Sequence, residues 1–253
     1  MRRPVLAFAL ALALAPAALL PGCREAPAAA CPAVAEPGAR TTTPKHRSPS
    51  SEARHREHLE QLAGGRAGLL LYGDSLVNRW PDAMLARDLG GYRPLNLGID
   101  GDRTQHLLHR LDPAALAGQS PAAAVVLVGT NNVADGDGAC AIHQGIAAIV
   151  AALRERLPGT PVLLVAIPPR GEDLAWRAEV IDAVNAGSRR LADGRDVLYL
   201  DVGDELRCRP AGGCRSYRGD MLHLSDAGYA VLGRRVAEAL AARIGPPPGA
   251  AGN

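Results

Sequence analysis

The sequence predicts an α/β domain, a three-layer α/β/α sandwich built on a five-stranded parallel sheet. Short apolar runs recur along the chain, and stretches with helical apolar spacing lie between them. Runs without polar alternation are typical of strands that are buried on both faces. Their alternation with helices favours parallel strands that are joined by right-handed crossovers and covered by helices on both sides.

Five apolar runs are the predicted strands, and most of them end at residues typical of turns. They are Leu69–Tyr72, Pro94–Leu97, Ala123–Val128, Val162–Ile167 and Val197–Leu200. In an open parallel sheet, ligands bind beyond the carboxyl ends of the strands. The residues to examine for function are therefore Asp74 and Ser75 after the first run, 98–102 after the second and 129–132 after the third.

Helical apolar spacing marks the segments between and after these strands. The predicted helices are Gln105–Leu111, Ile142–Leu157, Trp176–Leu191 and Tyr229–Ile244. Gly245 and the prolines at 246–248 end the last of them. We expect the folded domain to span residues 56–245 and residues 246–253 to form a disordered tail.

The first residues of the chain have the pattern of an export signal. Arg2 and Arg3 precede an apolar run from Val5 to Leu20, which is short for a transmembrane helix. We interpret residues 1–22 as a signal peptide. Residues 23–55 begin in a stretch rich in Ala, Pro, Thr and Ser without apolar periodicity, and we interpret them as a flexible linker.

The signal ends in Leu20-Pro21-Gly22-Cys23, which resembles the lipobox of bacterial lipoproteins. This resemblance implies lipidation of Cys23 and a periplasmic or cell-envelope lipoprotein. Pro21 is unusual at its position, and the alternative is ordinary cleavage near residues 15–17, which would give a soluble secreted protein. Both alternatives predict export from the cytoplasm.

Four further cysteines fit an oxidising compartment, namely Cys31, Cys140, Cys208 and Cys214. Four cysteines allow three complete pairings. We predict a Cys208–Cys214 disulfide, because these residues are close in sequence and flank a Gly-Gly pair, and we leave the pairing of Cys31 and Cys140 open. The chain has no C-x-x-C and no H-E-x-x-H motif, so no metal site is predicted.

Charge gives no indication of a nucleic-acid partner. The net charge is +2, and the sequence has no dense basic run. Contact with a membrane is expected only through an N-terminal lipid anchor.

One serine and one Asp-x-x-His segment could supply nucleophilic catalysis. Ser75 follows the first predicted strand, and a serine hydroxyl needs a base before it can attack. His223 is the only late histidine, and Asp220 precedes it by three residues, a spacing that can place the carboxylate beside the imidazole. Each signal alone is more often a helix cap or a surface pair. Their order on one alternating chain favours a catalytic triad.

Four motifs in this order resemble the SGNH, or GDSL, hydrolases over roughly residues 66–243. The motifs are Gly73-Asp74-Ser75-Leu76, Gly98-Ile99-Asp100-Gly101-Asp102, Gly129-Thr130-Asn131-Asn132 and Asp220-Met221-Leu222-His223. Residues 95–99, 128–132 and 169–172 resemble in particular the catalytic subunits of intracellular platelet-activating-factor acetylhydrolase. The resemblance implies a flavodoxin-like sandwich. The serine is not in a G-x-S-x-G motif, so the nucleophile elbow of α/β-hydrolases is not predicted.

The resemblance also implies roles for matching residues. Ser75 would be the nucleophile, His223 the base and Asp220 the residue that orients the base. The backbone N–H groups of Ser75 and Gly101 and the side-chain amide of Asn131 would form an oxyanion hole. The side chains of Leu76, Thr130 and Leu222 would wall the acyl pocket, and no cofactor is implied.

Three aspartates near these motifs have a simpler interpretation than a metal site. We expect Asp74, Asp100 and Asp102 to form turns by accepting hydrogen bonds from local backbone.

The expected activity is hydrolysis of short-acyl esters, acetyl above all, through an acyl-enzyme on Ser75. The expected substrate is a small ester, and an acetylated glycan or lipid would fit an exported protein. Two alternatives stay open. One is a lysophospholipase or thioesterase with a longer acyl groove, and the other is a tethered glycan-binding lipoprotein without turnover.

Overall fold

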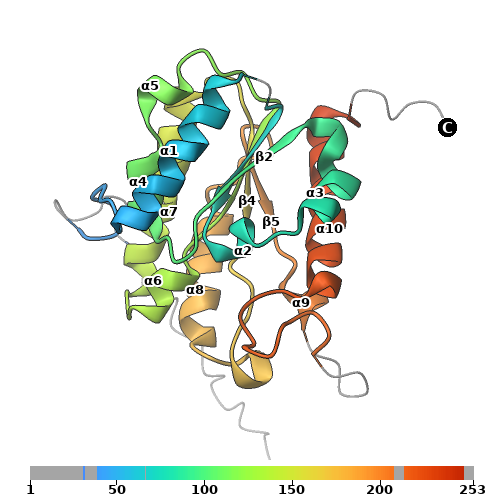
Figure 1. Cartoon of the computed structure of the whole chain (residues 1–253). Helices are drawn as coiled ribbons and strands as arrows, with labels where there is room; N and C mark the ends of the chain where they lie inside the picture. The colour runs from blue at the N-terminus through green and yellow to red at the C-terminus, as the bar shows by residue number, and fades with distance from the viewer. Residues whose placement is uncertain (1–30, 32–38, 66, 208–213, 248–253) are drawn as a thin grey trace, which may run out of the picture. The chain divides into compact units, whose positions relative to one another are not determined.

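The computed structural model describes residues 31, 39–65, 67–207 and 214–247, and these contain the five-stranded parallel sheet that the sequence predicts (Figure 1). The strand order is β2-β1-β3-β4-β5. The strands are β1 (Leu69–Gly73), β2 (Pro94–Gly98), β3 (Ala123–Leu127), β4 (Val162–Val165) and β5 (Val197–Leu200). This is the flavodoxin-like order, in which the strand order along the sheet reverses between β1 and β3.

The register aligns the carboxyl ends of the central strands. Gly73 at the end of β1 pairs with Gly98 of β2 on one side and with Leu127 of β3 on the other. The residues that follow these three strands therefore begin at the same edge of the sheet. This edge is the one at which the sequence predicts a site.

Helices cover both faces of the sheet, as predicted (Figure 1). One face is packed by α1 (Pro49–Ala63), α4 (Thr104–Arg110), α7 (Ala139–Arg156) and α8 (Ala178–Arg189), and the other by α3 (Asp82–Leu89) and α10 (Asp226–Ile244). The shorter helices are α2 (Ser75–Asn78), α5 (Pro113–Leu116), α6 (Thr130–Ala134) and α9 (Gly203–Leu206), with 3-10 turns at Gly90–Tyr92 and Glu172–Leu174. In the part of the chain that the structure describes, no helix is long and apolar enough to cross a membrane.

The strand β1 shows why an apolar run without alternation is needed here. All five of its residues are buried. Leu70 and Tyr72 belong to the core beneath α1, α4, α7 and α8, whereas Leu69 and Leu71 belong to the core beneath α3 and α10. A polar residue at any of these positions would be buried without water on either face.

The prediction of a flexible linker over 23–55 is wrong for residues 39–55, because the segment before α1 packs against the domain with Thr41 buried, and because α1 begins at Pro49. The Ser48 side chain accepts a hydrogen bond from Ser51 N, and Pro49 occupies the first helical turn, where its missing N–H costs nothing. The helix has few apolar residues and buries His55 and His58 beside Leu62. Apolar periodicity therefore could not reveal it. Residues 1–30 and 32–38 lie outside the described residues.

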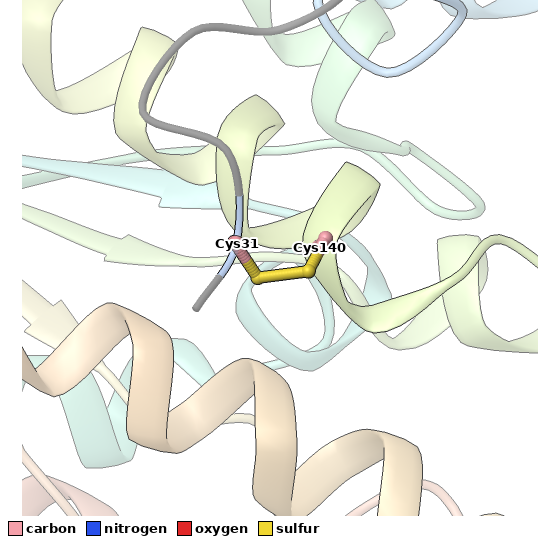
Figure 2. Close-up of a disulfide and its surroundings, with 2 residues drawn as sticks. All are labelled: Cys31 and Cys140. Atoms are coloured by element: carbon pink, nitrogen blue, oxygen red, sulfur yellow. A yellow bond between two sulfur atoms is a disulfide. The ribbon is translucent and has the colours of Figure 1, made fainter. Parts of the chain in front are cut away.

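A disulfide joins Cys31 to Cys140 at the start of α7 (Figure 2). The sequence left this pairing open. Cys214 is also disulfide-bonded, but Cys208 lies outside the described residues, so the Cys208–Cys214 pair stays a prediction. Cys23 and the proposed signal peptide also lie outside the described residues. The same holds for residues 248–253 of the predicted tail at 246–253.

Candidate active site

Ser75 is the first residue of α2 and directly follows the turn that ends β1. Asp74 is the N-cap of α2, and its Oδ1 accepts a hydrogen bond from Leu76 N at 2.9 Å. Gly73 allows this tight turn, because a Cβ at that position would collide with the carbonyl oxygen of Leu127 and the side chain of Val77. The turn fixes the backbone beneath the Ser75 hydroxyl, at the sheet edge where β1, β2 and β3 end.

His223 and Asp220 lie in the loop between α9 and α10. An isolated bridge between Tyr217 and Leu224 closes this loop, and Arg218 N donates to His223 O at 2.8 Å. Met221 has φ of 51°, a left-handed conformation that is uncommon outside glycine, and its carbonyl accepts from Gly171 N at 2.7 Å. The Tyr217–Leu224 bridge at the ends of the loop and the hydrogen bond from Gly171 thus fix the conformation of the loop.

The fold brings the three predicted triad residues together. Ser75 Oγ lies 2.9 Å from His223 Nε2, although the two residues are 148 positions apart. On its other side, His223 Nδ1 lies 2.6 Å from Asp220 Oδ2. When Nδ1–H donates to the carboxylate, Nε2 is the acceptor that faces the serine hydroxyl. This tautomer allows His223 to take the proton of Ser75.

Asp220 is held in its ionised form. Burial raises the pKa of its carboxyl, but hydrogen bonds from the His223 side chain and from the backbone N–H groups of His223 and Leu222 outweigh burial and lower the pKa to about 2. These bonds measure 2.9 Å from His223 N and 3.0 Å from Leu222 N, both to Oδ1. A negative Asp220 stabilises the imidazolium that forms when the base takes a proton.

Two of the three predicted oxyanion residues, Gly101 and Asn131, are linked through Asp102. Gly101 has φ of +77°, which favours glycine, and it belongs to the loop that follows β2. Asn131 Nδ2 donates one hydrogen to Asp102 O at 2.9 Å. An amide carries two hydrogens, so the second is available to a ligand. The Asn131 amide is thereby tied to the residue that follows Gly101.

The three predicted pocket residues differ in exposure. Leu76 is 1% exposed and packs in the core with Trp80 and Tyr229, whereas Thr130 is 2% exposed and Leu222 is half-buried. Arg170 Nη1 donates to Thr130 Oγ1 at 2.9 Å, and its guanidinium lies 4.5 Å from the centre of the Trp176 ring. Their role as an acyl pocket stays a prediction.

Of the three aspartates interpreted as turn formers, only Asp74 acts in that way. Asp100 instead accepts from Asn78 Nδ2 at 2.8 Å and from Arg79 Nε at 2.9 Å. Asp102 accepts from Arg110 Nε at 2.7 Å, and both of these side chains are almost fully buried. The expectation is wrong for Asp100 and Asp102, because their side chains bind arginines from other elements and not the local backbone.

Arg110 is a structural residue of the site that the sequence reasoning missed. Besides Asp102, its guanidinium donates to the carbonyl of Leu97 at 2.8 Å and of Gly73 at 3.3 Å, so it joins the ends of β1 and β2. A signal was present in the sequence. Arg110 lies three residues after Leu107, on the apolar face of a predicted helix, and a charge there indicates a buried partner.

Arg79 and Arg47 were missed as well. Arg79 Nη1 lies 3.5 Å from His223 Nδ1 while the same side chain pairs with Asp100. Arg47 Nε lies 3.6 Å from Asp102 Oδ1. Neither has a sequence signal, because their partners are remote in sequence. Within the described ranges, no cluster of three or more His, Cys, Asp or Glu side chains could hold a metal ion.

Comparison with known proteins gives a consistent result. Residues 62–231 match the GDSL-like Lipase/Acylhydrolase family. The chain is 34% identical over 168 residues to Platelet-activating factor acetylhydrolase IB subunit alpha1 of Pongo abelii, which is 66% of this chain and 72% of that protein. It is 33% identical over 170 residues to subunit alpha2 of Rattus norvegicus, covering 65% of this chain and 72% of that protein.

A solved structure is also similar. A Streptococcus pneumonia protein named for platelet activating factor superposes with a TM-score of 0.64 and 27% identity, covering 75% of this chain and 92% of that chain. The range that matches the family includes Ser75, Gly101, Asn131, Asp220 and His223.

Proposed function

The chain belongs to the GDSL-like lipase/acylhydrolase family and is an ester hydrolase, and we propose that it cleaves short-acyl esters, acetyl above all, through an acyl-enzyme on Ser75. The observation that carries this proposal is the continuous contact from Ser75 Oγ through His223 to Asp220, with distances of 2.9 and 2.6 Å. A serine hydroxyl in contact with an oriented imidazole is the arrangement that nucleophilic catalysis needs.

In the first half-reaction, Ser75 Oγ attacks the ester carbonyl carbon while His223 Nε2 accepts the hydroxyl proton. The carbonyl electrons move onto the oxygen, which accepts hydrogen bonds from the N–H groups of Ser75 and Gly101 and from the Asn131 amide. The tetrahedral intermediate then collapses. The bond to the alcohol breaks, and the alcohol leaves with the proton from His223.

Water completes the cycle. It attacks the acyl carbon while His223 takes one of its protons, and Ser75 Oγ leaves and regains that proton. The products are a carboxylic acid and the free enzyme. Asp220 remains ionised throughout, because its pKa of about 2 lies far below neutral pH.

Two observations support a short acyl group. The matched relatives are named acetylhydrolases. Leu76 and Thr130, which flank the nucleophile and the oxyanion asparagine, are buried and held by neighbouring side chains. Displacing packed side chains costs about 1–3 kcal/mol, or roughly one to two powers of ten in rate against a longer ester.

The experiment measures kcat/KM on p-nitrophenyl acetate, butyrate and octanoate for the native protein and for Leu222→Ala. We expect an acetate preference that relaxes toward butyrate in Leu222→Ala. A native preference for octanoate would favour the lysophospholipase or thioesterase alternative. Absence of Ser75 labelling by a fluorophosphonate, together with absence of turnover, would favour the non-catalytic alternative.

We further propose that the protein works outside the cytoplasm, with an acetylated glycan or lipid as its small ester substrate. Residues 1–22 have the composition of an export signal, and the Cys31–Cys140 disulfide is of a kind that persists in oxidising compartments. Lipidation of Cys23 would anchor it to the membrane. Mass spectrometry of the protein from a bacterial host tests this, and a Cys23→Ser form still held in the membrane would contradict the anchor.

A further inference from the structure

A segment that lies before the family match crosses the loop of the oxyanion hole. We name residues 39–48 the strap and residues 99–104 the oxyanion loop. The match begins at residue 62, so the strap is an addition to the matched region. Residues 32–38 join it to Cys31, which is disulfide-bonded to Cys140 of α7.

The strap is bonded to the oxyanion loop and to the helix that follows it. The Thr41 carbonyl accepts from Thr104 Oγ1 at 2.8 Å, and Thr41 itself is only 1% exposed. Lys45 N donates to Gln105 O at 3.1 Å. The strap is therefore packed against the protein at the position where the oxyanion loop enters α4.

Arg47 brings a positive charge to the centre of the loop. Its guanidinium lies against Gly101, since a Cβ built on that glycine would be 3.3 Å from Arg47 Nη1. Its Nε lies 3.6 Å from Asp102 Oδ1, a buried oxygen without a hydrogen-bond partner in the described part of the chain. Arg110 binds the other oxygen of the same carboxylate. Asp102 is thus held from inside by Arg110 and from the solvent side by Arg47.

Asp102 connects two of the proposed oxyanion donors. It directly follows Gly101, and its carbonyl accepts the hydrogen bond from Asn131 Nδ2. A displacement of Asp102 would therefore move both the Gly101 N–H and the Asn131 amide. Oxyanion donors act only when they are fixed at the position where charge develops.

We propose that the strap positions the oxyanion hole, with Arg47 as its positioning residue. This inference rests on the proposed function. Arg47 balances the Asp102 carboxylate and covers Gly101, so the donors stay in place without Arg47 touching the substrate. The effect belongs to the transition state, and kcat should therefore change much more than KM.

The experiment uses the full-length oxidised protein and compares Arg47→Met, which keeps length but removes charge, with Arg47→Lys, which restores charge. Arg54→Met is the matched control, because Arg54 is an exposed arginine of α1 that pairs only with Glu57 among the described residues. We expect Arg47→Met to lower kcat on p-nitrophenyl acetate by about tenfold, with KM within about twofold. Arg47→Lys should recover part of this loss, and Arg54→Met should behave as the native protein.

A double-mutant cycle then tests the strap as a unit. Cys31→Ser/Cys140→Ser releases the disulfide, and combining it with Arg47→Met should lower kcat by less than the product of the two separate losses. Circular dichroism must show that each variant is folded, and the cycle still tests the strap if Arg47→Met alone fails to fold, because Arg47→Gln, which also removes the charge, can take its place.

Several outcomes overturn the proposal. The first is a kcat in folded Arg47→Met equal to that of the native protein, and the second is a change in KM alone. The third is a kcat in Arg47→Lys no higher than in Arg47→Met. The fourth is a loss of kcat in the combined variant that equals the product of the two separate losses. A native protein that neither hydrolyses the ester nor reacts with a fluorophosphonate refutes the proposed function instead, so the two failures can be distinguished.

Discussion

The two sides of the active site place the same residue type in opposite environments. On the nucleophile side, residues 73–78, 99–104 and 129–132, Asp74 is completely buried. On the base side, residues 217–224, the Asp220 side chain is 49% exposed. Burial raises the pKa of Asp74 to about 7, whereas hydrogen bonds overcome the weaker burial of Asp220 and hold its pKa at about 2.

The difference lies in how many donors each carboxylate has. Asp74 accepts one hydrogen bond, from Leu76 N, and its Oδ2 is buried without a partner among the described residues. Asp220 accepts from the backbone of Leu222 and His223 and from the His223 ring. A fully buried carboxylate with one hydrogen-bond donor has a raised pKa, because burial disfavours its charged form. A partly exposed carboxylate with several donors has a lowered pKa, because the donors stabilise its charged form. The Asp220 carboxylate therefore keeps its negative charge beside His223, whereas Asp74 serves to fix the turn beneath Ser75.

Removing one reacting group from each side should give the largest loss. We expect Ser75→Ala and His223→Ala each to reduce kcat/KM by about 10⁴–10⁶-fold, with the double variant no worse than either, because the two groups act as a unit. Steady-state kinetics on p-nitrophenyl acetate measures this. Near-normal turnover in a folded Ser75→Ala protein would contradict the mechanism.

Removing only the negative charge of Asp220 should reduce activity less than removing Ser75 or His223. Asp220→Asn keeps the shape of the side chain but no longer stabilises the imidazolium, and we expect kcat to fall by about 10²–10⁴-fold, leaving more activity than His223→Ala. Asp220→Asn and His223→Ala should be assayed side by side. Asp226→Asn is the control, because Asp226 is an exposed residue of α10. Unchanged kcat in Asp220→Asn would show that the base side needs no charge.

Removing one fixed donor from the nucleophile side tests its geometric role. We expect Asn131→Ala to lower kcat by about 10²–10³-fold with a smaller change in KM, because the amide matters most when the oxyanion forms. Separate determination of kcat and KM checks this. A change in KM alone would mean that Asn131 binds the substrate in its ground state.

The two aspartates should give opposite and smaller dependences of stability on pH. The raised pKa of Asp74 adds stability below its unfolded value of 3.8, and this is lost as pH rises through about 7. The lowered pKa of Asp220 adds stability above 3.8, and this is lost as pH falls through about 2. We therefore expect Asp74→Asn to flatten the decline of Tm between about pH 4 and pH 7, the interval between the unfolded and folded pKa values. Scanning calorimetry across that range would contradict this if both proteins declined equally.

The sequence predicts those parts of the fold in which burial leaves a local pattern. The strands were predictable because four of them are unbroken apolar runs and only Asn96 interrupts the run of β2, and four helices were predictable from their spacing. Helix α1 was not, because it buries His55 and His58 in place of apolar residues. The positions of Ser75, Asp220 and His223 follow from motifs. Arg47 and Arg79 do not, because their partners are brought to them by the tertiary fold.

The separation of 148 residues between Ser75 and His223 has a consequence for folding. The nucleophile leaves the first strand of the sheet, and the base lies just before the last helix, so a chain whose carboxyl-terminal part has not yet docked holds a serine without a base. A chain in that state would not react with esters, whatever its content of secondary structure. Recovery of fluorophosphonate reactivity during refolding should therefore coincide with the docking of α10, and should not precede it.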